Sequence, residues 1–512
     1  MRLTQGLVRA VINCGPRIAT IDGDRRRTWF EVGDRVARIA AGLQARADMK
    51  VGDRVGILSH NCDTYFELYF GITWGGGVLT PLNTRLALPE LSFQLQDAGV
   101  ETLCYGQEFT AFAQQLLADG VVKRLVAMDG AATDAGLTHE GLIASHEPVD
   151  EHWGPPTDLA GIFYTGGTTG LPKGVMLSHG AIFSNAGNLL MSIPFDETCV
   201  NFHAAPMFHL SDIGIVFATM TGATHVFARQ FTAETMLETI HEHGVTHCFT
   251  VPAVIDRMTK YEKLEDLNIS SLQMLGYGGS WLPASTLALA RKKFPNVNFI
   301  QGFGQTEMGS CTVLTPSDHN VPEDHPRLRS CGRAAPAYII RIADEHGNEV
   351  PRGQIGEIIG RGPSIMSGYW NRPAETAEVM RDGWLYTRDA GWMDDEGYVY
   401  ITDRLKDMIV SGAENVYSIE VENALNWHPK IEETAVIGVP DEKWGERVHA
   451  VIVCKDNCTP PSLEEVRDFC RQRIAGYKTP KTISIFTEPL PRSAAGKIQK
   501  GPIRDKVLAS LG

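Results

Sequence analysis

A cluster of glycine, threonine and lysine is the strongest chemical signal in this sequence. It is the segment YTGGTTGLPKG, residues 164–174, which follows the apolar run LAGIFY and precedes a stretch with helical character. Small residues leave backbone N–H groups free to face a ligand, and the hydroxyls and the lysine ammonium add polar contacts. Such a loop between a strand and a helix is suited to a polyphosphate. The candidate residues are Thr165, Gly166, Gly167, Thr168, Thr169, Gly170 and Lys173.

Two more glycine-rich segments, GYGGSWLP (276–283) and GFGQTEMG (302–309), each follow an apolar run. Ligand crevices form at the carboxyl ends of parallel strands, so both segments are predicted to line one. Glu307 occupies the position where a dinucleotide-binding loop has its third glycine. A carboxylate there would repel a pyrophosphate unless a cation lay between them, so Glu307 is predicted to bind Mg²⁺.

Charged residues follow in three later segments. YTRDAGWMDDEGYVYITDRLKD (386–407) places Asp389 and Arg404 at turns, where a carboxylate suits ribose hydroxyls and a guanidinium suits phosphate or ribose oxygens. SGAENVYSIE (411–420) is a glycine-containing loop before a helix, and PRSAAGKIQK (491–500) presents Lys497 on a loop of small residues.

The elements that must hold these residues alternate between short β-branched runs and longer helical patterns, which indicates parallel sheets with helices on their faces. The predicted fold class is α/β, with a large N-terminal domain of mostly parallel, layered sheets over residues 1–402. Short strands with tight turns predict a β-rich subdomain over about 337–402. A smaller α+β C-terminal domain is predicted over 403–512.

Composition excludes several classes of protein. With 43% apolar and 21% charged residues, the chain of 512 residues is expected to fold rather than stay disordered. Its net charge of −14 argues against general nucleic-acid binding, which needs a positively charged surface. No apolar run reaches the length of a membrane span and no signal peptide is apparent, so a cytoplasmic protein is expected. Arg25–Arg27 leave weak peripheral association with a membrane open, and the oligomeric state is undecided, with a dimer as one option.

Taken together and in this order, the segments resemble the adenylate-forming acyl-CoA synthetases, a family that includes non-ribosomal adenylation domains and beetle luciferases. The resemblance covers essentially the whole chain and is strongest to bacterial fatty-acid–CoA ligases. It implies that ATP and a carboxylic acid form an acyl-adenylate and diphosphate, after which the thiol of coenzyme A attacks and releases AMP. The implied cofactors are ATP, Mg²⁺ and coenzyme A.

The resemblance also implies a role for each candidate residue. Thr165 and Glu307 would bind Mg²⁺, Thr306 the α-phosphate, and Asp389 and Arg404 the ribose. The remaining ATP-binding residues would be Gly278, Gly279 and Ser280 along the adenine, Phe303 stacking on it, and Gly302, Gly304 and Gln305 beside it. Lys497 would bridge the reacting carboxylate and the α-phosphate as the adenylate forms.

The same resemblance places a hinge at Asp403, about which the C-terminal domain would turn. This rotation would replace Lys497 with the loop of Ser411, Gly412 and Ala413, so that one crevice serves both half-reactions. The acyl pocket would be lined by His209, Ile213, Gly214, Val251 and Gly302, with His209 also bordering the pantetheine arm.

The chain departs from the family pattern at Gly166, where serine is commonest, and at Ala413, where a second glycine is frequent. Arg388 stands where the family has a glycine at an expected positive φ, and it could either displace Asp389 or point outward. An impaired site that binds ATP without turnover is therefore one alternative. A medium- or long-chain fatty acid is the first predicted substrate and an aryl or cinnamate-type acid the second; a carrier-protein acceptor and a luciferase-like oxygenase also stay open.

Overall fold

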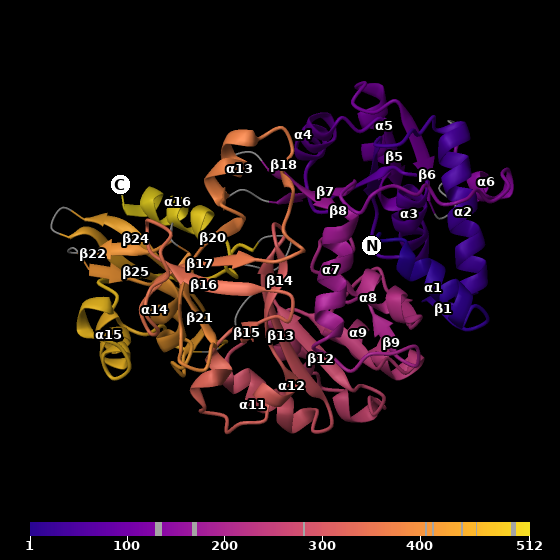
Figure 1. Cartoon of the computed structure of the whole chain (residues 1–512). Coiled ribbons are helices and arrows are strands. Elements are labelled where there is room, and N and C mark those ends of the chain that lie inside the picture. Colours follow the sequence, from indigo (N-terminus) through magenta and orange to yellow (C-terminus); the bar gives the residue numbers. More distant parts are fainter. Residues whose placement is uncertain are drawn as a thin grey trace.

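The computed structural model describes residues 1–128, 136–165, 172–279, 282–404, 407–411, 414–441, 444–456, 458–492 and 498–511. Four sheets carry the architecture (Figure 1). The largest has nine strands in the order β15-β14-β13-β12-β11-β9-β10-β1-β2, and every pair from β13 to β1 is parallel. Its strands are β1 Ile18–Asp22, β2 Arg25–Thr28, β9 Val200–Phe202, β10 Thr224–Phe227, β11 His247–Thr250, β12 Met274–Gly278, β13 Asn298–Gln305, β14 Gly309–Leu314 and β15 Arg333–Ala334.

The second large sheet has seven strands in the order β18-β8-β7-β4-β3-β5-β6. The pairs from β7 to β6 are parallel, and β8 and β18 add antiparallel strands at one edge. Its strands are β3 Arg54–Leu58, β4 Val78–Pro81, β5 Thr102–Tyr105, β6 Arg124–Ala127, β7 Leu159–Thr165, β8 Lys173–Ser178 and β18 Gly368–Tyr369.

Two five-stranded sheets complete the chain. One is antiparallel and consists of β16 Ile339–Ala343, β17 Gly356–Arg361, β19 Met380–Arg381, β20 Trp384–Met393 and β21 Val399–Arg404. The other is formed by β22 Ile409–Ser411, β23 Glu414–Val416, β24 Ile431–Asp441, β25 Gly445–Cys454 and β26 Thr482–Phe486. In Figure 1 this last sheet and its helices form the group at the left, opposite the N-terminal elements.

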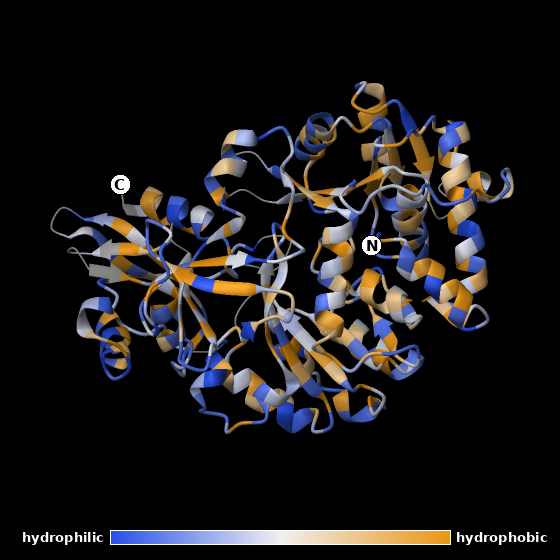
Figure 2. Cartoon of the chain, viewed as in Figure 1, coloured by the Kyte–Doolittle hydropathy of each residue, from blue (hydrophilic) through white to orange (hydrophobic). Residues whose placement is uncertain are grey.

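Helices cover the sheets and bury their apolar sides against them. They are α1 Gln5–Cys14, α2 Trp29–Arg46, α3 Asp63–Trp74, α4 Leu88–Ala98, α5 Thr110–Ala118, α6 His139–Ala144, α7 His179–Leu190, α8 Gly214–Thr221, α9 Ala233–His243, α10 Pro252–Thr259, α11 Ala284–Lys293, α12 Pro316–His319, α13 Pro373–Val379, α14 Ser418–Leu425, α15 Leu463–Arg471 and α16 Lys500–Leu511. Figure 2 shows apolar residues concentrated along the strands and polar residues on outward helix surfaces. None of the helices in the described ranges combines the length and hydrophobicity that a membrane span needs.

The predicted fold class is confirmed: the chain is an α/β protein with layered, mostly parallel N-terminal sheets and a smaller C-terminal part. Three local predictions are wrong. The segment after Lys173 is not helical but forms β8, which pairs back on β7; a short apolar run fits either element, and here the open edge of β7 decides. Ser178 then caps α7 by accepting a hydrogen bond from the Ala181 N–H at 3.1 Å.

The second error concerns Gly302–Gln305, which continue strand β13 instead of forming a loop after it. The third concerns Asp389 and Arg404, which lie within β20 and at the end of β21 rather than at turns. Arg25–Arg27 form strand β2, and the Arg27 guanidinium pairs with the buried carboxylate of Asp63.

Candidate active site

The predicted phosphate-binding segment connects β7 and β8, the two strands of a hairpin. Thr165, the last residue of β7, is the register partner of Lys173, the first residue of β8. Residues 166–171, which include Gly166, Gly167, Thr168, Thr169 and Gly170, lie outside the described residues. The pairing nevertheless brings a hydroxyl and an ammonium to the same end of the hairpin.

A second hairpin carries Thr306 and Glu307. Its strands β13 and β14 pair Gln305 with Gly309, so that residues 306–308 form the turn. Gly304 is required here because a Cβ at this position would lie 1.8 Å from the carbonyl oxygen of Gly309. The turn leaves the side chain of Glu307 half-buried.

Tyr369 joins these two hairpins. Its hydroxyl donates to Oε1 of Glu307 at 2.9 Å, and the Nζ of Lys173 stands 5.1 Å from the centre of its ring. The backbone holds the same arrangement, because β18 pairs Tyr369 with Val175 of β8 and the Met366 N–H donates to the carbonyl oxygen of Glu307 at 2.8 Å. Residues from three distant parts of the chain therefore meet at one point.

The electrostatics of this point suit a metal and a phosphate. Burial, followed by the negative charge of Glu307, raises the pKa of Tyr369 well above its usual value, so its hydroxyl is protonated and donates. Within the described residues, neither Glu307 nor Lys173 forms an ion pair with another side chain. A half-buried carboxylate with a spare oxygen fits a hard divalent cation, and an ammonium without a counter-ion fits a phosphate.

The predicted adenine and ribose residues lie on neighbouring strands. Gly278 of β12 and Gly302 of β13 are register partners, and Gly279 follows with φ of +77°, a conformation that favours glycine. Phe303 is partly buried against the main core, and Ser280 lies outside the described residues. Asp389, which is 6% exposed, and Arg404 are register partners across β20 and β21.

Arg388 has the positive φ that the sequence predicted, at +61°. Its guanidinium points to the surface, where Nη2 lies 2.6 Å from Oε2 of Glu378. Its backbone N–H donates to Oε1 of Glu357 at 2.8 Å, which fixes the turn of the chain. Of the two predictions for this residue, the outward-pointing one is therefore confirmed.

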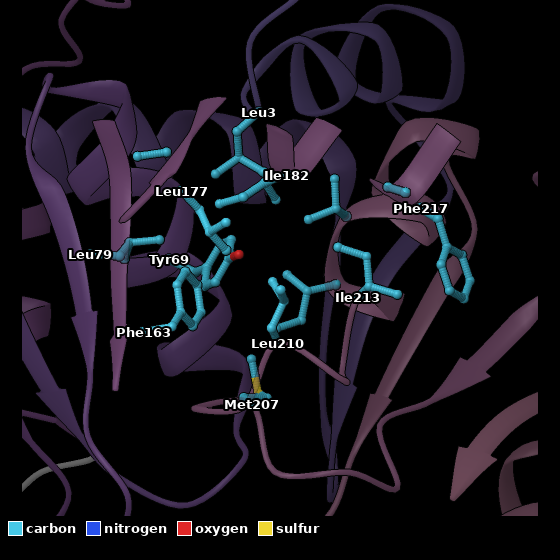
Figure 3. Close-up of a cluster of buried hydrophobic side chains, with 14 of the residues drawn as sticks. Leu3, Tyr69, Leu79, Phe163, Leu177, Ile182, Met207, Leu210, Ile213 and Phe217 are labelled. Atoms are coloured by element: carbon cyan, nitrogen blue, oxygen red, sulfur yellow. The ribbon is translucent and has the colours of Figure 1, made fainter. Parts of the chain in front are cut away.

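Of the predicted acyl residues, Ile213 belongs to the largest apolar cluster of the protein. His209 is half-buried, with its Nδ1 2.9 Å from the Ser211 hydroxyl, and Val251 precedes α10. Ile213 and Gly214 are buried at the start of α8. Figure 3 shows that Ile213 faces the side chains of the cluster that also holds Tyr69, Leu177, Ile182, Met207, Leu210 and Phe217.

The residues assigned to the second half-reaction are only partly visible. Ser411 ends β22 and is the register partner of Gly445 in β25. Gly412, Ala413 and Lys497 lie outside the described residues, and Asp403 is described by its backbone alone, at the end of β21.

Comparison with known proteins agrees with this geometry. Residues 8–370 match the family of AMP-binding enzymes, and residues 420–497 match the C-terminal domain of AMP-binding enzymes. The chain belongs to this family. It is therefore an enzyme of the adenylate-forming acyl-CoA synthetase type, an AMP-forming ligase that uses ATP and coenzyme A, with Mg²⁺ as the usual metal of the family.

Three relatives give the range of the similarity. The chain is 37% identical to a feruloyl-CoA synthase from Amycolatopsis over 94% of both chains. It is 34% identical to the fatty acid–[acyl-carrier-protein] ligase ScoC of Streptomyces coeruleorubidus, over 94% of this chain and 92% of the relative. The crystal structure of the anthranilate-CoA ligase AuaEII with anthranoyl-AMP superimposes with a TM-score of 0.91 at 25% identity, over 100% of this chain and 98% of that one.

Two residues that connect the segments of the candidate site were missed by the sequence reasoning. Tyr369 is one; its only local signal is a glycine followed by two aromatic residues, GYW at 368–370. The other is Asp97 of α4, which accepts a hydrogen bond from the Tyr164 hydroxyl at 2.7 Å and pairs with Arg372 at 3.0 Å. Asp97 thus ties the residue before Thr165 to the segment that carries Tyr369.

Proposed function

We propose that the enzyme activates an apolar carboxylic acid with ATP at the junction of the two hairpins and transfers it to coenzyme A. The observation that carries this proposal is Tyr369, which brings Lys173 and Glu307 together from separate segments. An ammonium beside the ring and a carboxylate bonded to its hydroxyl suit the phosphates of a metal–nucleotide complex.

Each candidate residue would have a separate role in the first half-reaction, the formation of the acyl-adenylate. Thr165 and Glu307 would hold Mg²⁺, which supplies charge neutralisation to the phosphates when bound. Lys173 would hold the outer phosphates, Thr306 the α-phosphate, and Asp389 with Arg404 the ribose. Lys497 would stabilise the charge that develops between the carboxylate and the α-phosphate.

The second half-reaction would follow a rotation of residues 403–512 about Asp403. Two features support this proposal: the antiparallel sheet ends at Arg404 with β21, and the C-terminal sheet begins at Ile409 with β22. The turn would bring Ser411, Gly412 and Ala413 to the site in place of Lys497. A cytoplasmic location belongs to the same proposal.

The acid is proposed to be apolar because the segment between β9 and the end of β10, residues 203–227, contains no lysine or arginine that could bind a second carboxylate. Met207, Leu210 and Ile213 in this segment are all under 9% exposed. A medium- or long-chain fatty acid is the first candidate. An aryl or cinnamate-type acid is the second, and the similarity to a feruloyl-CoA synthase and to an anthranilate-CoA ligase favours it.

The deciding experiment measures diphosphate and AMP release with each acid of a panel, with and without coenzyme A. The panel runs from acetate to palmitate and includes benzoate, anthranilate, 4-coumarate and ferulate. AMP release that depends on coenzyme A, with one optimum of chain length or ring, supports the proposal and names the acid. Diphosphate release without any response to coenzyme A points to a carrier-protein acceptor, and no release with any acid contradicts the proposal.

A further inference from the structure

Four buried polar side chains form a continuous hydrogen-bonded chain beneath residues 204–211, the segment that carries His209. His203 Nδ1 lies 2.8 and 3.0 Å from the two carboxylate oxygens of Asp212. His203 Nε2 lies 2.8 Å from Nδ1 of His225, and His225 Nε2 lies 3.2 Å from the Thr219 hydroxyl. All four residues are at most 8% exposed.

The surroundings of this chain are apolar or neutral. Aromatic rings cover the two imidazoles, namely those of Trp29, Phe66 and Phe227. The hydroxyls of Tyr65 and Tyr69 on α3 are the other titratable groups near Asp212, and burial keeps both protonated by raising their pKa. In the described part of the chain, Asp212 forms an ion pair with His203 alone.

The directions of the hydrogen bonds fix the number of protons. The Thr219 hydroxyl lies 2.6 Å from the carbonyl oxygen of Ile215 and must donate to it, so it accepts from His225 Nε2–H. Burial lowers the pKa of His225 well below its usual value, so His225 is neutral and its Nδ1 carries no proton. His203 Nε2 must then donate to His225, while a second proton lies between His203 Nδ1 and Asp212. The pair of His203 and Asp212 thus holds one proton more than a neutral imidazole and a carboxylate would.

This pair also closes the base of the segment 204–211, because its two members flank it. Asn61 holds the interior of the same segment: its Nδ2 donates to the carbonyl oxygens of His203 and Ala205 at 3.1 and 2.8 Å, and its Oδ1 accepts from the Met207 N–H at 2.8 Å. Gly214 allows the close packing next to Asp212, since a Cβ there would lie 3.3 Å from Oδ1 of Asp212 and 2.9 Å from the Asn201 amide.

We propose that His203 and Asp212 share this additional proton, with His225 as its acceptor partner, and that the protonated pair positions the segment 204–211. His203 and Asp212 are then positioning residues for the acid. The role in positioning the acid rests on the proposed function, whereas the proton count and the ordering of residues 204–211 do not. Loss of the proton leaves one buried partner without a hydrogen bond, which loosens the base of the segment.

The proton count is tested by NMR of the full chain labelled with ¹⁵N in its histidine rings. The wild type should show one ring with both nitrogens protonated, and this signal should be absent from His203→Gln. In Asp212→Asn the same ring should lose one of its two protons. A His203 ring without both protons in the wild type would overturn the proposal.

Positioning is tested by hydrogen exchange of peptides that cover residues 204–211, followed by mass spectrometry. Asp212→Asn should raise exchange in this segment about tenfold, and His225→Leu should do the same if Asp212→Asn does not fold. His225→Gln keeps an acceptor for His203 and should restore wild-type exchange. Unchanged exchange in both Asp212→Asn and His225→Leu would contradict the positioning role.

His247→Gln is the matched control, because His247 is buried in the same sheet and, among the described residues, hydrogen-bonds to the Thr246 hydroxyl and the carbonyl oxygen of Pro194. It should leave exchange over 204–211 unchanged.

With the preferred acid, Asp212→Asn should raise KM for the acid about tenfold and leave KM for ATP within twofold. A wild type that is inactive toward every acid would contradict the proposed function. The NMR spectra and the hydrogen-exchange rates would still test the shared proton and the positioning of residues 204–211, because neither measurement needs turnover.

Discussion

Asp389 and Arg404 lie directly opposite one another on the antiparallel strands β20 and β21. A stretch of sequence rich in turn residues separates them, yet the sheet register makes them neighbours. Arg388, immediately before Asp389, adopts the left-handed conformation at φ of +61° and turns its side chain to the surface. Arg388 is therefore accommodated next to Asp389 with its side chain at the surface, which argues against an impaired enzyme.

Replacement of Arg388 by glycine should stabilise the protein slightly and leave ATP binding unchanged. A left-handed conformation costs a non-glycine residue about 1–2 kcal/mol, and the exposed ion pair with Glu378 returns at most about 1 kcal/mol. We expect the free energy of unfolding in urea to rise by about 0.5–1 kcal/mol and the Kd for ATP to stay within twofold. Glu378→Gln, which removes only the ion pair, is the control. A tenfold gain in ATP affinity would revive the impaired-site alternative.

Replacement of Tyr369 by phenylalanine should weaken the dependence of ATP binding on Mg²⁺. The ring beside Lys173 stays, but Oε1 of Glu307 loses its hydrogen bond and the carboxylate loses its fixed orientation. A hydrogen bond to a charged group is worth about 1.5–3 kcal/mol, so the Mg²⁺ concentration for half-maximal ATP binding should rise about tenfold or more. Calorimetric titration of ATP at several Mg²⁺ concentrations measures this without turnover.

Tyr398→Phe is the matched control for that experiment. The Tyr398 hydroxyl also donates to a carboxylate, that of Asp318 at 2.6 Å, but neither residue belongs to the proposed site. If both variants shift the Mg²⁺ dependence equally, Tyr369 has no special relation to the metal.

The fold and the order of the site segments were predictable from the sequence because alternating apolar patterns and glycine clusters are local signals. The partner of Glu307 was not, because the contact with Tyr369 depends on β18 pairing with β8 nearly 200 residues earlier. The helix expected after Lys173 failed for a related reason: a short apolar run takes the conformation that the neighbouring strand offers. The contact between His203 and His225 was not predictable either, since nothing in the spacing of two isolated histidines indicates that they hydrogen-bond to each other.

Replacement of Gly302 by alanine should alter the choice of acid and spare the fold. A Cβ at Gly302 would meet nothing nearer than the Ser310 hydroxyl at 3.7 Å, so the methyl group fits. If Gly302 borders the acyl site, KM for the bulkiest accepted acid should rise more than KM for a smaller one. Gly278→Ala is the contrasting variant, because its Cβ would lie 2.7 Å from the carbonyl oxygen of Gly302 and should destabilise the fold by about 1–3 kcal/mol. Equal changes in KM for all acids in Gly302→Ala would remove Gly302 from the acyl site.

Replacement of Lys497 by alanine should separate the two half-reactions. If Lys497 acts only as the adenylate forms, diphosphate release should fall by roughly 10²–10³, as is usual when a transition-state charge contact is lost. Transfer of a supplied acyl-adenylate to coenzyme A should keep most of its rate. Comparable losses in both assays would contradict the proposed rotation about Asp403.

Four buried histidines, His179, His247, His319 and His449, should make the protein less stable in acid. Burial is the largest cause and lowers the pKa of His179 to about 3 and that of the other three to about 4. Because these values lie below the unfolded pKa of about 6.5, the unfolded chain binds more protons between about pH 6.5 and pH 4. Stability therefore falls as the pH falls through this window and is independent of these groups above it. Each histidine should cost about 2 kcal/mol at pH 5.

His449 offers the cleanest test of this linkage. Its ring nitrogens lie 2.7 and 3.0 Å from the hydroxyls of Thr482 and Ser484, which a glutamine amide can also bond. The free energy of unfolding is measured in urea at pH 7 and at pH 5. Its decrease between these two pH values should be about 2 kcal/mol smaller in His449→Gln than in the wild type. His346→Gln changes an exposed histidine and should leave the loss as it is in the wild type. If His449→Gln and the wild type lose the same free energy, His449 must take up its proton in the folded protein, and burial does not hold it neutral.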